Sequence, residues 1–143
     1  MDGSSDRNES EEIRGKIRDA IEAIPDSGIS PIARALGRIL VSSHYGEESA
    51  IPHHKLFPQL ETMWKWTERR KMTLRDVRQA KRDLFDAGIP VTGNDHGYFI
   101  IRGTKEGGEA SAYLAAKGTD LMAQSSRMRD VVERFFGRQL AFV

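Results

Sequence analysis

The segment from Thr73 to Pro90 most constrains the fold, because it carries a helix start, a helix period and a helix stop in that order. Thr73 is a favourable N-cap, and Asp76 follows three residues later as in a capping box. Four apolar side chains then fall on one face of a helix: Leu74, Val77, Leu84 and Phe85. Gly88 suits a left-handed C-terminus, and Pro90 cannot continue the helix. These signals predict a helix over residues 74–87.

Three helices are predicted before this one. Isoleucines spaced by four, four and three residues form one apolar stripe over residues 11–24. Ser30-Pro31 is typical of an N-cap followed by proline at the first helical position, and an apolar face follows it. A third helix is predicted over residues 53–70, with Pro58 in its first turn.

A β-hairpin is predicted directly after the helix of residues 74–87. Residues 89–91 and 98–101 are short β-type runs, and the residues between them are dense in turn formers. The expected fold class is therefore mainly α with a small β-hairpin.

A long final helix is predicted over residues 109–140. Its apolar residues recur every seven positions: Leu114, Leu121, Met128 and Phe135. Such a series either packs on the chain's own core or pairs with a second copy, as in a coiled coil. Polar residues beside the series weaken the pairing reading, and we expect a homodimer only slightly more than a monomer. The predicted organisation is a disordered acidic tail (1–10), a folded domain (11–102) and a C-terminal helical extension (103–143) that is a candidate dimerisation element.

Composition excludes several classes of function. The chain has no cysteine, which rules out disulfide frameworks and thiolate metal sites and fits a cytoplasmic protein. No apolar run reaches the length of a membrane span, and the N-terminus does not resemble a signal peptide. The histidines lack the spacing of a metal motif, and no nucleophile motif accompanies Ser42 or His44. We therefore expect no enzyme activity, no cofactor and no metal.

Charge is concentrated in one part of the chain. The whole chain has a net charge of only +1, but residues 63–85 hold eight bases against three acids. On a helical wheel four of the side chains in this block share a face away from the apolar stripe: Arg75, Arg78, Gln79 and Arg82. This pattern is that of a helix in the major groove of duplex DNA, where Arg can bond guanine and Gln can bond adenine. The alternative is a solvated helix face laced with ion pairs.

The residues around this helix also resemble a known family. The run Thr73-Leu74-Arg75-Asp76-Val77-Arg78-Gln79, then Gly88-Ile89-Pro90-Val91 and Gly97-Tyr98-Phe99, looks like the winged helix-turn-helix domains of phage and prophage regulatory or replication-associated proteins. The resemblance is good over residues 73–100 and loose over residues 30–140. It implies a winged helix-turn-helix flanked by an N-terminal helix and a long C-terminal helix. The basic segment Lys55–Lys71 is longer than its counterpart in such domains.

The resemblance implies sequence-specific binding of double-stranded DNA, by a regulator or a replication accessory. Arg75, Arg78, Gln79 and Arg82 would face bases or nearby phosphates. The residues near the helix start would contact the phosphate backbone: Arg69, Arg70, Lys71 and Thr73. The hairpin would be the wing, where His96 or Arg102 would contact phosphate, although the expected tip has no Lys or Arg and carries Asp95.

Two other functions remain open from the sequence. The same scaffold can be a protein–protein interaction module, or a subunit of a larger replication or packaging assembly. Trp66 lies beside several bases, an arrangement that can stack single-stranded bases, but packing against the hairpin or the final helix is the preferred interpretation.

Overall fold

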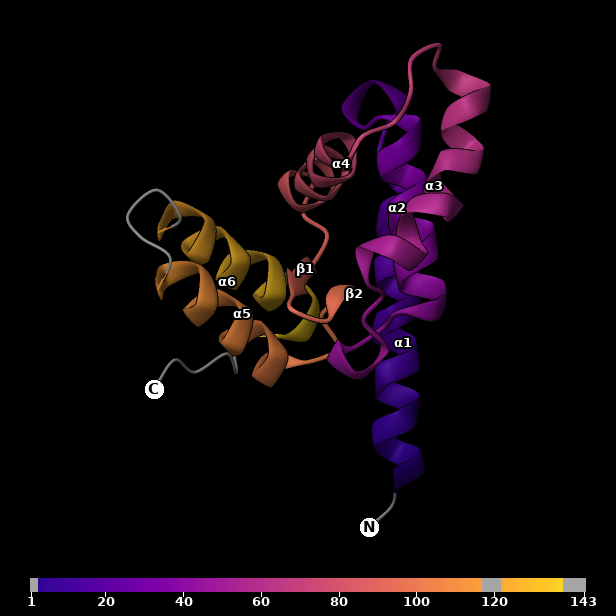
Figure 1. Cartoon of the computed structure of the whole chain (residues 1–143). Helices are drawn as coiled ribbons and strands as arrows, with labels where there is room; N and C mark the ends of the chain where they lie inside the picture. Colours follow the sequence, from indigo (N-terminus) through magenta and orange to yellow (C-terminus); the bar gives the residue numbers. More distant parts are fainter. Residues whose placement is uncertain (1–2, 117–121, 138–143) are drawn as a thin grey trace.

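The computed structural model describes residues 3–116 and 122–137 (Figure 1). In these ranges the chain is mainly helical, with one small antiparallel hairpin, as the sequence predicts. The elements are α1 (Gly3–Ala23), η1 (Asp26–Gly28), α2 (Pro31–Ser43), η2 (Glu47–Ser49), α3 (His53–Thr67), α4 (Leu74–Asp86), β1 (Val91–Asn94), β2 (Gly97–Ile100), α5 (Thr104–Ala116) and α6 (Met122–Phe136). Within the described ranges no helix has both the length and the apolar character needed to cross a bilayer.

Helix α2 lies at the centre of the main core. It packs against α1, α3, α4 and β2, and its Leu36 and Leu40 are completely buried. Ser30 caps its first turn by accepting a hydrogen bond from the Ala33 amide at 3.2 Å. A Cβ on Gly37 would lie 3.1 Å from the Leu84 side chain and 3.2 Å from that of Ile21. The missing side chain therefore lets α1 and α4 approach α2 closely from two sides.

The hairpin is tied into this core by a third segment of chain. β1 and β2 pair in register from Val91↔Ile100 to Asn94↔Gly97. Ile51, between α2 and α3, exchanges two backbone hydrogen bonds of 2.9 Å with Tyr98. Strand β2 is consequently paired on both sides, with β1 on one and with the Ile51 segment on the other.

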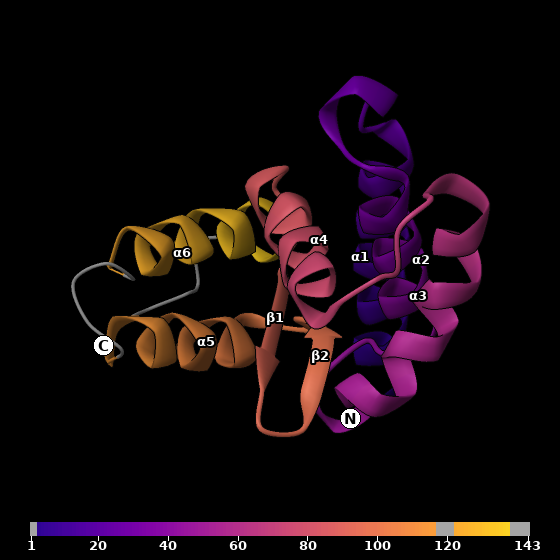
Figure 2. The same cartoon turned by 45° about the horizontal axis from the view of Figure 1, so that its top comes forward.

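The C-terminal region corrects the sequence prediction. Instead of one long helix over residues 109–140, the chain forms two helices, α5 and α6, which pack side by side (Figure 2). The buried hydroxyls of Ser111 and Ser125 lie 2.8 Å apart between them, and Gly107 of α5 lies close to Val132 of α6. Of the seven-residue series, Met128 is buried and Phe135 is partly buried against the core. Leu114 falls within α5, and Leu121 lies outside the described residues.

The N-terminus differs as well. Helix α1 begins at Gly3, so the part of the predicted disordered tail that the structure describes, residues 3–10, is helical. Ile17 and Ile21 of the predicted apolar stripe are completely buried, in agreement with the periodicity.

Candidate functional site

Helix α4 is positioned by one apolar face and a capped first turn. Val77, Ala80 and Leu84 are at most 1 % exposed, and they hold the helix against α2. Asp76 accepts hydrogen bonds from the Thr73 amide at 2.8 Å and from the Thr73 hydroxyl at 3.0 Å. The carboxylate thus satisfies an amide at the start of the helix, as the sequence predicts. This packing fixes which side of α4 faces outward.

The outward side of α4 carries the four side chains that the sequence placed there. Arg75, Arg78, Gln79 and Arg82 lie on it, away from the buried apolar face. Gln79 donates to Asp83 at 2.9 Å, and Arg82 lies 3.9 Å from Asp86. For Arg75 and Arg78 no carboxylate partner exists among the described residues. The face therefore presents two unneutralised guanidinium groups together with a weakly paired one.

The loop before α4 is ordered by Arg70 rather than left free. The Arg70 guanidinium donates to both oxygens of Asp76, at 2.9 and 2.5 Å, and lies 4.9 Å from the Trp64 ring centroid. The Trp64 indole nitrogen donates to the Arg70 carbonyl at 2.6 Å. The Arg70 guanidinium, helped by the Thr73 amide and hydroxyl, lowers the pKa of Asp76 to about 2. The charge of Arg70 and the hydroxyl of Thr73 are thus engaged by Asp76, although both residues are exposed, whereas Arg69 and Lys71 are exposed without a carboxylate partner among the described residues.

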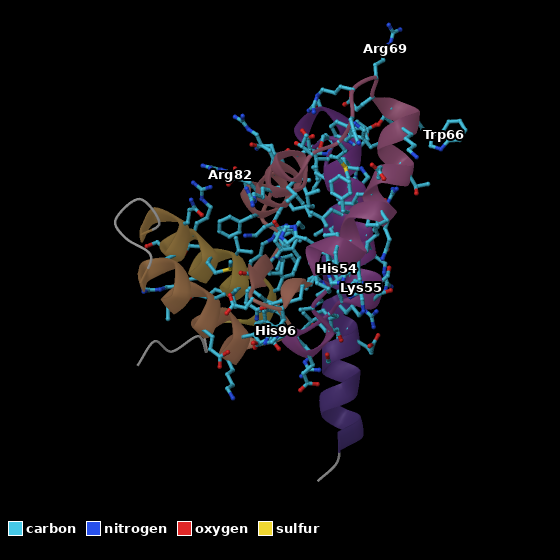
Figure 3. The ribbon with its side chains drawn as sticks, viewed as in Figure 1. His54, Lys55, Trp66, Arg69, Arg82 and His96 are labelled. Atoms are coloured by element: carbon cyan, nitrogen blue, oxygen red, sulfur yellow. The ribbon has the colours of Figure 1, made fainter. Side chains whose placement is uncertain are left out.

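Trp66 is in the environment opposite to the one expected. Its side chain is 87 % exposed, near the end of α3, and points away from the body of the protein (Figure 3). The expectation that it packs against the hairpin or the final helix is wrong. Its neighbour two residues earlier, Trp64, occupies the inner side of α3 and is 6 % exposed.

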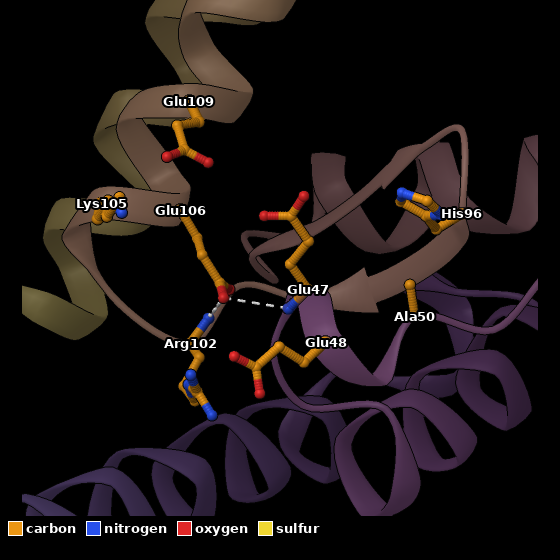
Figure 4. A pocket seen from close by; sticks show the side chains of 8 residues that line it. All are labelled: Glu47, Glu48, Ala50, His96, Arg102, Lys105, Glu106 and Glu109. Atoms are coloured by element: carbon orange, nitrogen blue, oxygen red, sulfur yellow. Dashed lines mark hydrogen bonds between the residues drawn. The ribbon is translucent and has the colours of Figure 1, made fainter.

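The structure places His96 and Arg102 apart from the α4 face. Both line a hollow of about 690 Å³ between η2, the hairpin turn and the start of α5, and four glutamates line the same hollow: Glu47, Glu48, Glu106 and Glu109 (Figure 4). Glu106 accepts from the backbone amides of Glu47 at 3.0 Å and Arg102 at 2.8 Å. Asn94 of the hairpin donates to Glu47 at 3.1 Å. Glu47 therefore ties the hairpin to η2, and Glu106 ties η2 to the start of α5. The four carboxylates outnumber Arg102 and Lys105 in the hollow, which makes this region unfavourable for a phosphate.

Two basic residues beside α4 were missed by the sequence analysis. Lys81 lies on the inner edge of α4, with its ammonium 5.5 Å from the Tyr98 ring centroid. Arg127 of α6 forms an ion pair with Asp86 at the end of α4 and lies 5.9 Å from the Phe85 ring centroid. On the helical wheel Lys81 falls within the apolar stripe, between Val77 and Phe85, which was a usable signal of its partial burial. No local signal places Arg127 there, because the contact depends on how α6 returns to the core.

Comparison with known proteins yields no relative: the chain matches no family model, no curated protein and no solved structure. Within the described residues no group of three or more histidine or acidic side chains is placed to hold a metal ion. The functional interpretation therefore depends on the geometry of α4 and its surroundings.

Proposed function

We propose that the protein binds double-stranded DNA through the outer face of α4, as a binding protein rather than an enzyme. The observation that carries the proposal is the position of Arg75, Arg78, Gln79 and Arg82 on the outer face of a helix whose opposite face is buried. A helix with its side chains is about as wide as the major groove, so this face can reach base edges without rearrangement of the core.

The charge pattern around α4 supports the same partner. Arg75 and Arg78 lack carboxylate partners in the described chain, so no internal ion pair has to break before they contact DNA. Arg69 and Lys71 are exposed at the N-terminal side of the helix, where backbone contacts would fix its register. We leave Arg70 and Thr73 out of the proposed contacts because their polar groups are held by Asp76.

A winged helix-turn-helix is the architecture that we propose for this interface. In its favour, helices precede α4 and the hairpin follows it directly in the chain. The connection between the two helices, residues 68–73, is longer than the usual turn of three or four residues. The hairpin turn faces the glutamates of Figure 4. We therefore assign DNA contact to α4 and the preceding loop, and not to His96 or Arg102.

Salt dependence tests the proposal most directly. The affinity of the full chain for duplex fragments is measured at several salt concentrations, for the native protein and for the double variant Arg75→Ala/Arg78→Ala. We expect the double variant to bind about 10- to 100-fold more weakly, if the two side chains contribute as ordinary base or phosphate contacts. The slope of log K against log salt should become less negative by roughly 0.9 for each phosphate that the variant no longer neutralises.

A matched control removes two positive charges as well, but at positions away from α4. Arg18 of α1 and Lys55 of α3 are both exposed, and Lys55 lies well away from Arg82 (Figure 3). The double variant Arg18→Ala/Lys55→Ala should bind duplex almost as the native protein does. Equal losses in the two double variants, or a native affinity that does not change with salt, would refute binding through α4.

Sequence specificity is a separate part of the proposal. Gln79 is the side chain on this face best suited to adenine, but it donates to Asp83 in the free protein. Replacing Gln79 with Ala should alter the ranking of duplexes that differ at one base pair, with little effect on the salt slope. A uniform loss of affinity for all duplexes would instead place Gln79 at the backbone.

A further inference from the structure

A second hollow lies between α4, the hairpin and α6, and it adjoins the proposed DNA-binding face because Arg78 and Arg82 belong to both. Its volume is about 250 Å³. Helix α4 supplies three cationic side chains to it, namely Arg78, Lys81 and Arg82. No acidic side chain lines it among the described residues, in contrast to the hollow of Figure 4. The two hollows therefore have opposite electrostatic character.

Lys81 is the most unusual of the three cations. Its side chain is partly buried, and no carboxylate pairs with it in the described part of the chain. Its ammonium has the ring of Tyr98 as a neighbour, at 5.5 Å from the centroid. Burial lowers the pKa of Lys81, because the charged form has lost much of its water. A partly desolvated cation without a counter-charge attracts an anion more strongly than one in open solvent.

The charges of Arg78 and Lys81 also act on His53, which lies on the other side of Tyr98. His53 packs edge-on against that ring, with centroids 4.7 Å apart. The pKa of His53 is lowered by burial and then by the charges of Arg78 and Lys81. Both cations thus lie close enough to His53 to disfavour its protonated form, after the larger effect of burial.

The remaining lining offers hydrogen-bond donors and an apolar floor. Thr92 and Tyr98 of the hairpin carry hydroxyl groups, and Gln124 of α6 carries an amide. Phe85 and Met128 contribute apolar surface to the same hollow. Three cations and three neutral donors exceed what one carboxylate can accept, but they match a phosphate group, with its three terminal oxygens and charge near −2.

We propose that this hollow is a phosphate-binding site centred on Lys81, which takes a phosphate ester whose apolar part rests on Phe85 and Met128. The phosphate has two potential sources with the same chemistry, the backbone of bound DNA or a free small phosphate ester. The first source rests on the proposed function, and the second does not. Arg78 and Arg82 line the hollow and also belong to the α4 face, so the two sources are separated by whether duplex and a small phosphate compete.

Binding of small phosphates to the full chain tests the site without DNA. Inorganic phosphate and phenyl phosphate are titrated at constant ionic strength while the NMR signals of Thr92, Tyr98 and Gln124 are followed, with sodium chloride as the non-specific anion. We expect saturable shifts with both phosphates, tighter binding of phenyl phosphate because of the apolar floor, and no saturable shift with chloride. Lys81→Met should weaken both phosphates at least tenfold, whereas Lys55→Met, an equal charge change on α3, should not.

Two further variants and a competition experiment complete the test. Lys81→Arg keeps the charge and should retain phosphate binding, which separates loss of the cation from loss of folding. If the phosphate comes from DNA, phenyl phosphate displaces duplex and Lys81→Met weakens duplex binding as well. If it comes from a free ester, phenyl phosphate still binds the duplex complex. The proposal is overturned if neither phosphate saturates the site, or if Lys81→Met and Lys55→Met behave alike. Absence of duplex binding alone would instead refute the proposed function and leave the phosphate site standing.

Discussion

Replacing Gly97 with alanine should be among the most damaging single changes in the chain. Gly97 begins β2 with φ +124°, in the region that favours glycine. A Cβ there would lie 1.9 Å from the Ile51 carbonyl oxygen and 2.6 Å from the Pro52 nitrogen. Both contacts are with backbone, so no side-chain rotation relieves them. The segment at Ile51 must move away from the hairpin.

The loss of stability can be estimated from the interactions that this movement breaks. Ile51 and Tyr98 exchange two backbone hydrogen bonds of 2.9 Å, each worth about 1 kcal/mol. Holding a Cβ-bearing residue at positive φ adds roughly 1–2 kcal/mol. We expect Gly97→Ala to lower the free energy of unfolding by about 3–4 kcal/mol, a large part of the stability of a typical domain.

Urea unfolding of the full chain measures this directly. The midpoint should fall while the dependence on urea concentration stays unchanged, because the same surface is exposed on unfolding. Gly103→Ala is the matched control, since a Cβ at that position meets no atom within 4 Å. A loss below about 1 kcal/mol for Gly97→Ala, or equal losses in the two variants, would show that Ile51 does not hold the hairpin as described.

Three further changes have expected outcomes. Asp76→Asn should lower the free energy of unfolding by about 1 kcal/mol at pH 6, because the helix cap is weakened. The pKa of Asp76 falls to about 2 on folding, so the contribution of the carboxylate is complete above pH 4 and should vanish as the pH falls toward 2. Acid-unfolding curves of the native protein and the variant measure this difference. Lys81→Met should raise the thermal midpoint at pH 7, by on the order of 1 kcal/mol in stability, because it removes an unpaired, partly buried charge. That advantage should shrink as the pH rises toward 10.5, since the lowered pKa of Lys81 lets the native protein lose the charge first; an advantage that is constant with pH would contradict this origin. Gly107→Ala should lower the free energy of unfolding by roughly 1–3 kcal/mol, because its Cβ would lie 2.6 Å from the Val132 side chain. In a double-mutant cycle, adding Val132→Ala should recover part of this loss.

The sequence was most informative where structure is set by neighbouring residues. The predicted helix of residues 74–87 agrees with α4, and the hairpin is confirmed. The signals involved are local: a cap at Thr73, a positive φ at Gly88 and a proline two residues beyond it. Burial along α4 largely follows the helical period: Val77, Leu84 and Phe85 are buried as predicted, but Leu74 at the start of the same stripe is 45 % exposed.

Prediction failed where distant segments decide the outcome. The seven-residue series was extended into one helix, but the contacts that fix the C-terminal pair, such as Ser111 with Ser125, join residues on different helices. His96 does lie in the hairpin turn, as predicted, but its acidic surroundings were not foreseen because they come from Glu47 and Glu106, distant in sequence. The helical period indicates that Trp64 faces inward with Leu60, but whether another segment covers Trp66 depends on the packing around α3, and the structure leaves it exposed.

Helix α6 packs against α5 and α1 of its own chain, and this packing bears on the kind of DNA site that the protein would recognise. Met128 and Phe135, which in a zipper would contact a second copy, are used within the monomer. A reader that binds as a symmetric dimer recognises an operator with a dyad, two half-sites one helical turn apart. A single α4 instead covers one short stretch of the groove, so the matching operator would be asymmetric and only a few base pairs long. Footprints on such an operator would lack mirror symmetry.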